Sequence, residues 1–205
     1  MKHLLLLLPL LIISLLFITG KTSQEPIYDT DGTELSTDLR YHILLADQGI
    51  GGGLSFAVGS IDRCLFHVFH EHDEEAIGTK VLQFKPWNAS SDGAVRLSTN
   101  IIIQFDVFTT CVEATHWYVD VLPLMSLPEL RQYVAVGKPE SQNFIPPSMF
   151  RVERYGSTTA GGYKLVWCTD DGVCQDLGLD VYQKRNRWLT VNGTPLAVVF
   201  KKAHK

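Results

Sequence analysis

The sequence predicts an all-β fold. Short segments rich in Val, Ile, Phe, Tyr and Trp recur along the chain, and Gly, Pro, Asn and Asp, which favour turns, separate them. Almost no segment carries apolar residues at the three- to four-residue spacing of an amphipathic helix. Strands at this spacing are typical of a closed barrel or a sandwich, since both arrangements protect the edges of a sheet.

Each predicted strand combines β-branched or aromatic residues with polar ones and is bounded by turn formers. In chain order, the predicted strands are 40–46, 54–58, 65–70, 80–84, 101–108, 116–121, 149–155, 163–168, 178–183, 187–191 and 195–202. The best helical alternative is 127–136, which is short and contains Pro128. A faint similarity between 95–105 and 187–200 fits a repeat of about one third of the folded chain.

The first 23 residues are predicted to be a secretory signal peptide. Lys2 and His3 precede an apolar run over 4–17, which is too short for a confident membrane span. A retained anchor is the alternative, and the polar segment 21–25 argues against it. We therefore expect a secreted protein with one domain over 24–205.

Charge and motifs exclude several classes of function. The chain has a formal charge of −4, and loss of the leader removes two further positive charges, Lys2 and Lys21. An acidic surface argues against nucleic acid or an anionic membrane as the partner. Neither G-x-S-x-G nor H-E-x-x-H occurs, and the glycines at 49–53 lack a phosphate-binding spacing. We expect neither an enzyme nor a cofactor.

The four cysteines, Cys64, Cys111, Cys168 and Cys174, most simply form two disulfides in an exported chain. Cys168 and Cys174 flank an Asp-Gly turn signal, so they can face each other across a tight loop. This pairing leaves Cys64 for Cys111. A zinc site is a poorer explanation, because no CxxC pair occurs.

A histidine-rich segment over 67–75 raises the possibility of a metal site, since imidazole and carboxylate groups bind zinc and copper. Alternate residues of a strand share a face, so His70 and His72 could converge while His67 points away. Two ligands are too few without a distant third. We therefore expect a solvated strand end and no metal.

The first residues after the leader resemble the N-terminal signature of the plant Kunitz soybean-trypsin-inhibitor family. The matching residues are Ile27, Asp29, Gly32, Leu35, Tyr41 and Ile43. Further matches in family order are Gly51–Gly53 with Leu54, Arg63-Cys64, Ile77-Gly78-Thr79, Phe105, Cys111, Trp117, 150–153, 163–166 with Cys168, 174–181, Pro195-Leu196 and Phe200. The stretch "RLSTNIIIQF" at 96–105 is similar to the miraculin-like branch.

The resemblance implies a β-trefoil of twelve strands in three pseudo-repeats, with disulfides Cys64–Cys111 and Cys168–Cys174. It also implies a monomeric inhibitor of an endopeptidase, most simply a serine protease, that acts in plant defence outside the cell or in the vacuole. Within the signature, Asp29 can cap a turn, Gly32 can adopt a backbone conformation costly for other residues, and Tyr41 can bury its ring. These three residues are expected to fix the first hairpin.

In this family, one exposed loop enters the protease as a substrate mimic, and the equivalent loop here is 84–96. The predicted loop residues are Lys85, Pro86, Trp87, Asn88, Ala89, Ser90 and Arg96. Pro86 and Trp87 match the family motif, but Asn88 occupies the specificity position, where a trypsin-like pocket prefers Arg or Lys. Thr37 stands where the family has a supporting Asn beneath the loop.

One feature of this loop bears on its function. Asn88-Ala89-Ser90 is an N-glycosylation sequon, and a glycan at Asn88 would obstruct docking. A second sequon at Asn192 contains an Asn-Gly pair that favours a hairpin turn.

The alternative function is a non-inhibitory miraculin-like, storage or sugar-binding protein, in which Trp87 and Trp188 could stack on a sugar.

Overall fold

The computed structural model describes residues 24–46, 52–58, 64–71, 80–87, 92–122, 131–137, 149–156, 162–182 and 186–204. The predicted signal peptide, 1–23, lies outside these residues. Within the described ranges, no helix has the length and hydropathy needed to cross a membrane.

The described residues form twelve strands and no helix, which confirms the all-β prediction. The strands are β1 (Arg40–Leu45), β2 (Leu54–Val58), β3 (Phe66–His70), β4 (Leu82–Pro86), β5 (Ile101–Phe105), β6 (Trp117–Leu122), β7 (Arg131–Val136), β8 (Met149–Arg154), β9 (Tyr163–Cys168), β10 (Cys174–Tyr182), β11 (Asn186–Val191) and β12 (Val198–Lys202).

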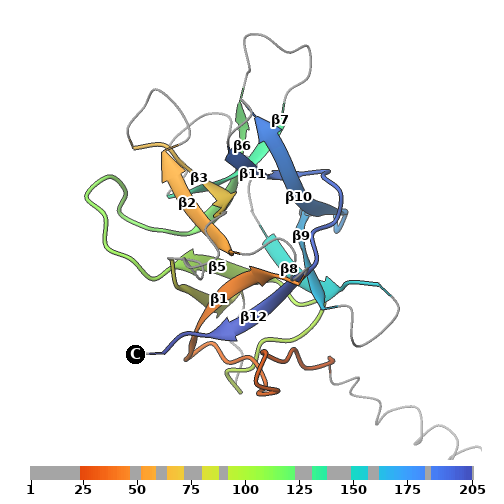
Figure 1. Cartoon of the computed structure of the whole chain (residues 1–205). Helices are drawn as coiled ribbons and strands as arrows, with labels where there is room; N and C mark the ends of the chain where they lie inside the picture. The colour runs from red at the N-terminus through yellow and green to blue at the C-terminus, as the bar shows by residue number, and fades with distance from the viewer. Residues whose placement is uncertain are drawn as a thin grey trace, which may run out of the picture.

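Half of these strands close into a barrel. Neighbours pair in the order β12-β1-β4-β5-β8-β9, and a further pairing of β12 with β9 completes the ring. Every one of these pairings is antiparallel. Closure removes the sheet edges on which another chain could pair, as the sequence led us to expect. The barrel occupies the lower part of Figure 1.

The other strands form three hairpins, β2–β3, β6–β7 and β10–β11, above the barrel (Figure 1). The inner strands β3, β7 and β11 each pair with the other two, so the hairpins meet in a triangle. A six-stranded barrel capped by three hairpins is a β-trefoil, which confirms the predicted architecture.

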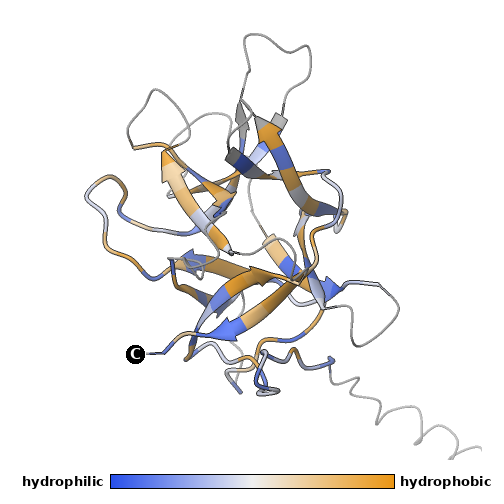
Figure 2. Cartoon of the chain, in the orientation of Figure 1, coloured by the Kyte–Doolittle hydropathy of each residue, from blue (hydrophilic) through white to orange (hydrophobic). Residues whose placement is uncertain are grey.

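The core fills the barrel and the underside of the hairpins. Tyr41, Phe84, Phe105, Phe150 and Phe200 are fully buried, and each comes from a different one of five of the six barrel strands. The ring centroids of Phe84 and Phe200 lie 5.5 Å apart and those of Phe84 and Tyr41 lie 5.9 Å apart. Figure 2 shows apolar residues along barrel and hairpin strands alike. β4 is therefore firmly anchored where it leads into the predicted loop.

Both predicted disulfides are present, Cys64–Cys111 and Cys168–Cys174. The second joins residues that are direct cross-strand partners in β9 and β10. The Asp-Gly pair between them lies in a turn, as predicted, because Gly172 has a φ of 84°.

Strand β7 is the main difference from the sequence prediction. The segment 127–136 is the helical alternative, yet its described part, Arg131–Val136, is a strand. Val134, Ala135 and Val136 are buried between β6 and β3, so tertiary pairing decides the local structure. The predicted strand 101–108 also ends earlier, at Phe105.

The N-terminal hairpin forms as its signature residues predict. Asp29 Oδ1 accepts hydrogen bonds from the backbone amides of Asp31, at 3.0 Å, and Thr33, at 2.8 Å. Gly32 has a φ of 75°, which favours glycine. The buried Tyr41 hydroxyl accepts a hydrogen bond from the Ser36 amide at 3.0 Å. The signature therefore fixes a turn and a buried ring.

Candidate functional site

The predicted loop connects β4 to β5, and the structure describes both of its arms. The first arm ends at Trp87 and the second begins at Asp92. The predicted site residues Asn88, Ala89 and Ser90, with the candidate glycosylation site, lie outside the described residues. Lys85 is exposed on β4, and the Trp87 side chain is 40% exposed just beyond it.

The first arm is held by the barrel. Lys85 and Pro86 continue the β4–β5 ladder opposite Ile102 and Ile101. Beyond the ladder, the amide of Trp87 donates to the carbonyl of Asn100 at 3.1 Å. The backbone of this arm is thus fixed up to the residue before Asn88.

Asn100 is itself held by the next barrel strand. Its Oδ1 accepts a hydrogen bond from Nε of Arg151 in β8 at 2.6 Å. Nearby, the amide of Ser98 donates to the carbonyl of Val152 at 3.0 Å. Contacts with β8 therefore fix the place where the second arm enters β5.

The second arm pairs with the N-terminal segment. Ala94 and Arg96 form isolated β-bridges with Ser36 and Pro26. The amide of Val95 donates to the carbonyl of Leu35, and the amide of Leu97 donates to the carbonyl of Glu25, both at 2.9 Å. The signature hairpin consequently does more than begin the fold, because it is also the support on which this arm lies.

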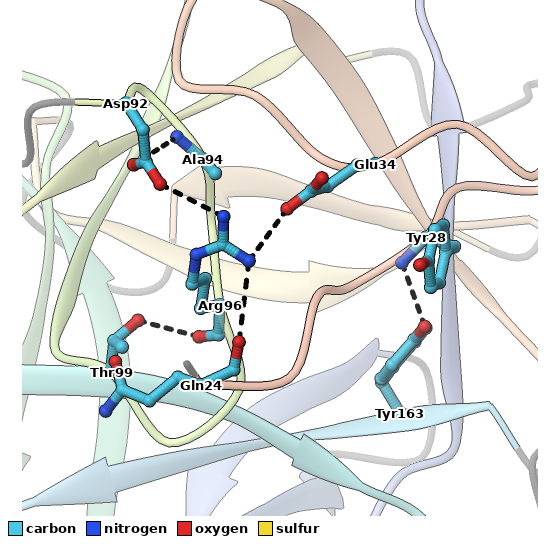
Figure 3. Close-up of polar contacts among 8 residues, drawn as sticks. All are labelled: Gln24, Tyr28, Glu34, Asp92, Ala94, Arg96, Thr99 and Tyr163. Atoms are coloured by element: carbon cyan, nitrogen blue, oxygen red, sulfur yellow. Dashed lines mark hydrogen bonds and ion pairs between the residues drawn. The ribbon is translucent and has the colours of Figure 1, made fainter. Parts of the chain in front are cut away.

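Arg96 is part of the second arm, and its side chain lies between two carboxylates (Figure 3). Its guanidinium contacts Glu34 and Asp92, each at 3.0 Å, and donates to the carbonyl of Gln24 at 3.4 Å. The hydrogen bond with Asp92, together with the charge of Glu34, raises the pKa of Arg96 above its ordinary value. Arg96 therefore holds the arm to the N-terminal segment.

Thr37 supports the loop from the position at which the plant Kunitz family has a supporting Asn. Its backbone amide donates to the carbonyl of Gly93 at 2.8 Å, and its hydroxyl donates to the same oxygen at 3.1 Å. Gly93 has a φ of 65°, so a left-handed turn presents this carbonyl to Thr37. A threonine thus supplies two donors at the base of the loop.

Sequence reasoning did not identify the partners that anchor the arms. Glu34, Asp92, Asn100 and Arg151 carry no motif, and the contacts join segments far apart in the chain. Asp92, Asn100 and Arg151 help, with Trp87, to line a cleft of about 600 Å³ between the two arms. The only local signal is Asp92, four residues before Arg96.

The histidine-rich segment does not form a cluster in the part that the structure describes. The expected solvated strand end is wrong for His67 and His70, because pairing within the hairpin triangle buries both side chains. No three metal-binding side chains come together among the described residues. His67 packs against the rings of Tyr133 and Trp188, and burial lowers its pKa to about 4. His72 lies outside the described residues.

The predicted turn at Asn192 is confirmed. Asn192 has a φ of 61°, and its amide donates to the carbonyl of Asp176 at 3.0 Å. The next residue, Gly193, lies so close to Gly178 that a Cβ on Gly193 would be 2.6 Å from the Cα of Gly178. This close approach accounts for the Asn-Gly pair.

Most of the curated relatives reported for the chain are named as inhibitors. The α-amylase/subtilisin inhibitor of Oryza sativa subsp. japonica is 41% identical over 96% of this chain and 94% of its own length. Miraculin of Synsepalum dulcificum is 29% identical over 91% of this chain and 87% of its own length. The identity to the rice protein is thus higher than the identity to miraculin.

Solved structures share the fold over most of the chain. A rice bifunctional α-amylase/subtilisin inhibitor aligns with a TM-score of 0.69 and 38% identity, over 88% of this chain and all of its own. Soybean trypsin inhibitor in complex with porcine pancreatic trypsin aligns with a TM-score of 0.71 and 26% identity, over the same shares.

The match to the family is equally broad. The legume Kunitz family model, described as "Trypsin and protease inhibitor", matches residues 27–202, from the signature hairpin to the last strand. Its members among the relatives are inhibitors and not enzymes. The chain belongs to the plant Kunitz family of trypsin and protease inhibitors.

Proposed function

We propose that the protein inhibits a serine endopeptidase of the subtilisin type, with the 84–96 loop bound in the protease active site as a substrate mimic. The observation that supports this proposal best is the anchoring of both arms. Trp87 is tied to Asn100, and Gly93, Val95 and Arg96 are tied to the N-terminal segment. Arms that are already ordered lose little conformational entropy on binding.

The residue at the specificity position favours a protease without an acidic pocket. Asn88 carries no charge, and a trypsin-like pocket has an aspartate at its base. Beside it, Trp87 offers a partly exposed ring as a second contact. The cereal relatives named for subtilisin inhibition point to the same class of target.

The decisive experiment is a titration of native and deglycosylated protein against subtilisin, trypsin, chymotrypsin, papain and an aspartic protease. Stoichiometric inhibition of subtilisin by the deglycosylated form supports the proposal. Inhibition of none of these enzymes by either form contradicts it.

Asn88→Arg is expected to tighten inhibition of trypsin by about 100-fold, because the new guanidinium can pair with the pocket aspartate. The measurement is the inhibition constant for bovine trypsin. Asn88→Gln is the matched control, since it also removes the sequon but adds no charge. Equal inhibition constants for the two variants would show that residue 88 does not enter the specificity pocket.

Arg96→Ala is expected to weaken inhibition of subtilisin about fivefold, since two ion pairs at the base of the loop together contribute about 1 kcal/mol. The measurement is the inhibition constant. Lys164→Ala is the control, because Lys164 forms an ion pair of similar exposure with Asp176, away from the loop. A larger loss in the control than in Arg96→Ala would contradict this role.

A second candidate function is inhibition of an α-amylase. Three cereal relatives, 36–41% identical to this chain, carry that activity in their names together with subtilisin inhibition. The test is an α-amylase assay with the free protein and with the protein saturated by subtilisin. Inhibition that persists in the saturated form would assign α-amylase to a different surface.

The non-inhibitory alternative predicts no block of any protease and retention on a sugar column. One of its two candidate aromatics, Trp188, is buried against His67 and Phe69 and is not available to stack on a sugar. Of these two tryptophans, Trp87 alone has a partly exposed ring, and it belongs to the proposed inhibitory loop.

We further propose that the protein is secreted after removal of residues 1–23. The apolar leader and the two disulfides, which form in oxidising compartments, support this localisation. N-terminal sequencing of the mature protein from its source tissue tests the cleavage site.

A further inference from the structure

A row of side chains on the outside of the barrel leads to the base of the inhibitory loop. His116 Nε2 lies 2.9 Å from Gln104 Oε1, and Gln104 Nε2 lies 3.2 Å from Gln83 Oε1. Gln83 Nε2 in turn lies 3.1 Å from the carbonyl oxygen of Thr37. The amide and hydroxyl of the same Thr37 donate to the carbonyl of Gly93. The hydrogen bonds run without a break from the β5–β6 connection to the loop.

Each group in this row donates in the same direction. The imidazole donates to the first amide oxygen, each amide NH₂ donates to the next acceptor, and Thr37 donates twice to Gly93. Burial, followed by the charge of Lys85, lowers the pKa of His116, so the neutral ring is favoured. Nε2 is assigned the proton because its partner, Gln104 Oε1, is an acceptor. From His116 to the Thr37 carbonyl, each bond can polarise the next one. Beyond it the link is mechanical, because the amide and hydroxyl that donate to Gly93 belong to the same residue as this carbonyl.

The strand register explains why the row is straight. Gln83 and Gln104 are direct cross-strand partners in β4 and β5, and Gln104 forms a β-bridge with His116. Their neighbours Leu82, Phe84, Ile103 and Phe105 point inward and are buried. The row lies on the outer face of the two strands that carry the loop.

We propose that Gln83, Gln104 and His116 are positioning residues for the inhibitory loop. They fix the Thr37 backbone so that the Thr37 amide and hydroxyl both reach the carbonyl of Gly93. This inference rests on the proposed function, because positioning matters for a loop that must hold one shape. The three side chains are half-buried and lie outside the core, so the stability of the barrel does not depend on their packing.

The first test is Gln83→Met, which keeps the length of the side chain and removes its donor. We expect subtilisin inhibition to weaken about tenfold, the loop to be cleaved faster in the complex, and the urea midpoint to change little. Gln175→Met is the matched control, since Gln175 lies in β10, outside this row. An unchanged inhibition constant in Gln83→Met would overturn the proposal.

A second pair of variants separates positioning from packing. His116→Gln keeps a donor near the same place and should retain tight inhibition, whereas His116→Leu should lose about as much as Gln83→Met. Combining Gln83→Met with Thr37→Val should weaken inhibition by less than the sum of the two single effects, because Thr37→Val removes one of the two donors through which Gln83 acts on Gly93. Full additivity would contradict a single row.

Residue-resolved amide hydrogen exchange tests the row independently of inhibition. The Thr37 amide, which donates to Gly93, should exchange about tenfold faster in Gln83→Met and at the wild-type rate in Gln175→Met. If the wild type inhibits no protease but this exchange accelerates, the proposed function fails and the positioning role stands. Unchanged exchange at Thr37 would refute the positioning role even in a working inhibitor.

Discussion

Replacing both Cys64 and Cys111 with serine is expected to lower the free energy of unfolding by about 4 kcal/mol. The disulfide closes a loop with a sequence separation of 47, and its loss gives the unfolded chain more conformations. The closed segment contains β3, β4, the proposed inhibitory loop and β5. The bridge therefore encloses the candidate loop and the two strands that carry it.

The measurement is urea denaturation of the wild type and the variant without reductant. The matched control replaces Cys168 and Cys174, whose separation is 6 and whose expected cost is about 2 kcal/mol. If the short bridge proved the more costly to remove, native contacts rather than chain entropy would govern the effect of the disulfides.

The second large effect concerns pH. His67 is buried between Tyr133 and Trp188, and its pKa falls from 6.5 to about 4. The unfolded chain thus takes up a proton at this residue before the folded chain does. The contribution of His67 to stability is present above pH 6.5 and decreases as the pH falls toward 4, by about 3 kcal/mol in total.

His67→Phe isolates this contribution, because phenylalanine fills a similar space and does not titrate. Free energies of unfolding are measured for both proteins at pH 7, 5.5 and 4. The variant should gain about 3 kcal/mol relative to the wild type between pH 7 and pH 4. Two parallel curves would show that His67 remains neutral in the unfolded chain or becomes protonated without cost in the folded one.

Much of the fold could be predicted from local sequence. Alternating residues such as those around Phe84 identify a strand directly, and the Asp-Gly pair between Cys168 and Cys174 predicts both a turn and a disulfide. The segment before Val136 was not predictable in the same way. Its sequence fits a helix as well as a strand, and its partners in β3 and β6 decide the outcome.

The sequence predicted where the candidate loop lies and that Thr37 stands beneath it, but it did not predict the other supports. Pro86 and Trp87 mark the loop through a family motif, whereas Glu34 and Arg96 become neighbours only when the N-terminal hairpin lies against the second arm. Contacts over such separations depend on closure of the barrel. For the same reason, Gln83 and His116 look like ordinary surface residues in the sequence.

The pairing of the second arm with residues 24–28 has a practical consequence for recombinant work. Gln24 contacts Arg96, and Glu25 contacts both Leu97 and Arg154. A protein trimmed to begin at residue 29 would keep its barrel strands but lose these partners, and a purification tag fused directly to Gln24 would crowd the same place. Affinity tags therefore belong at the carboxyl terminus.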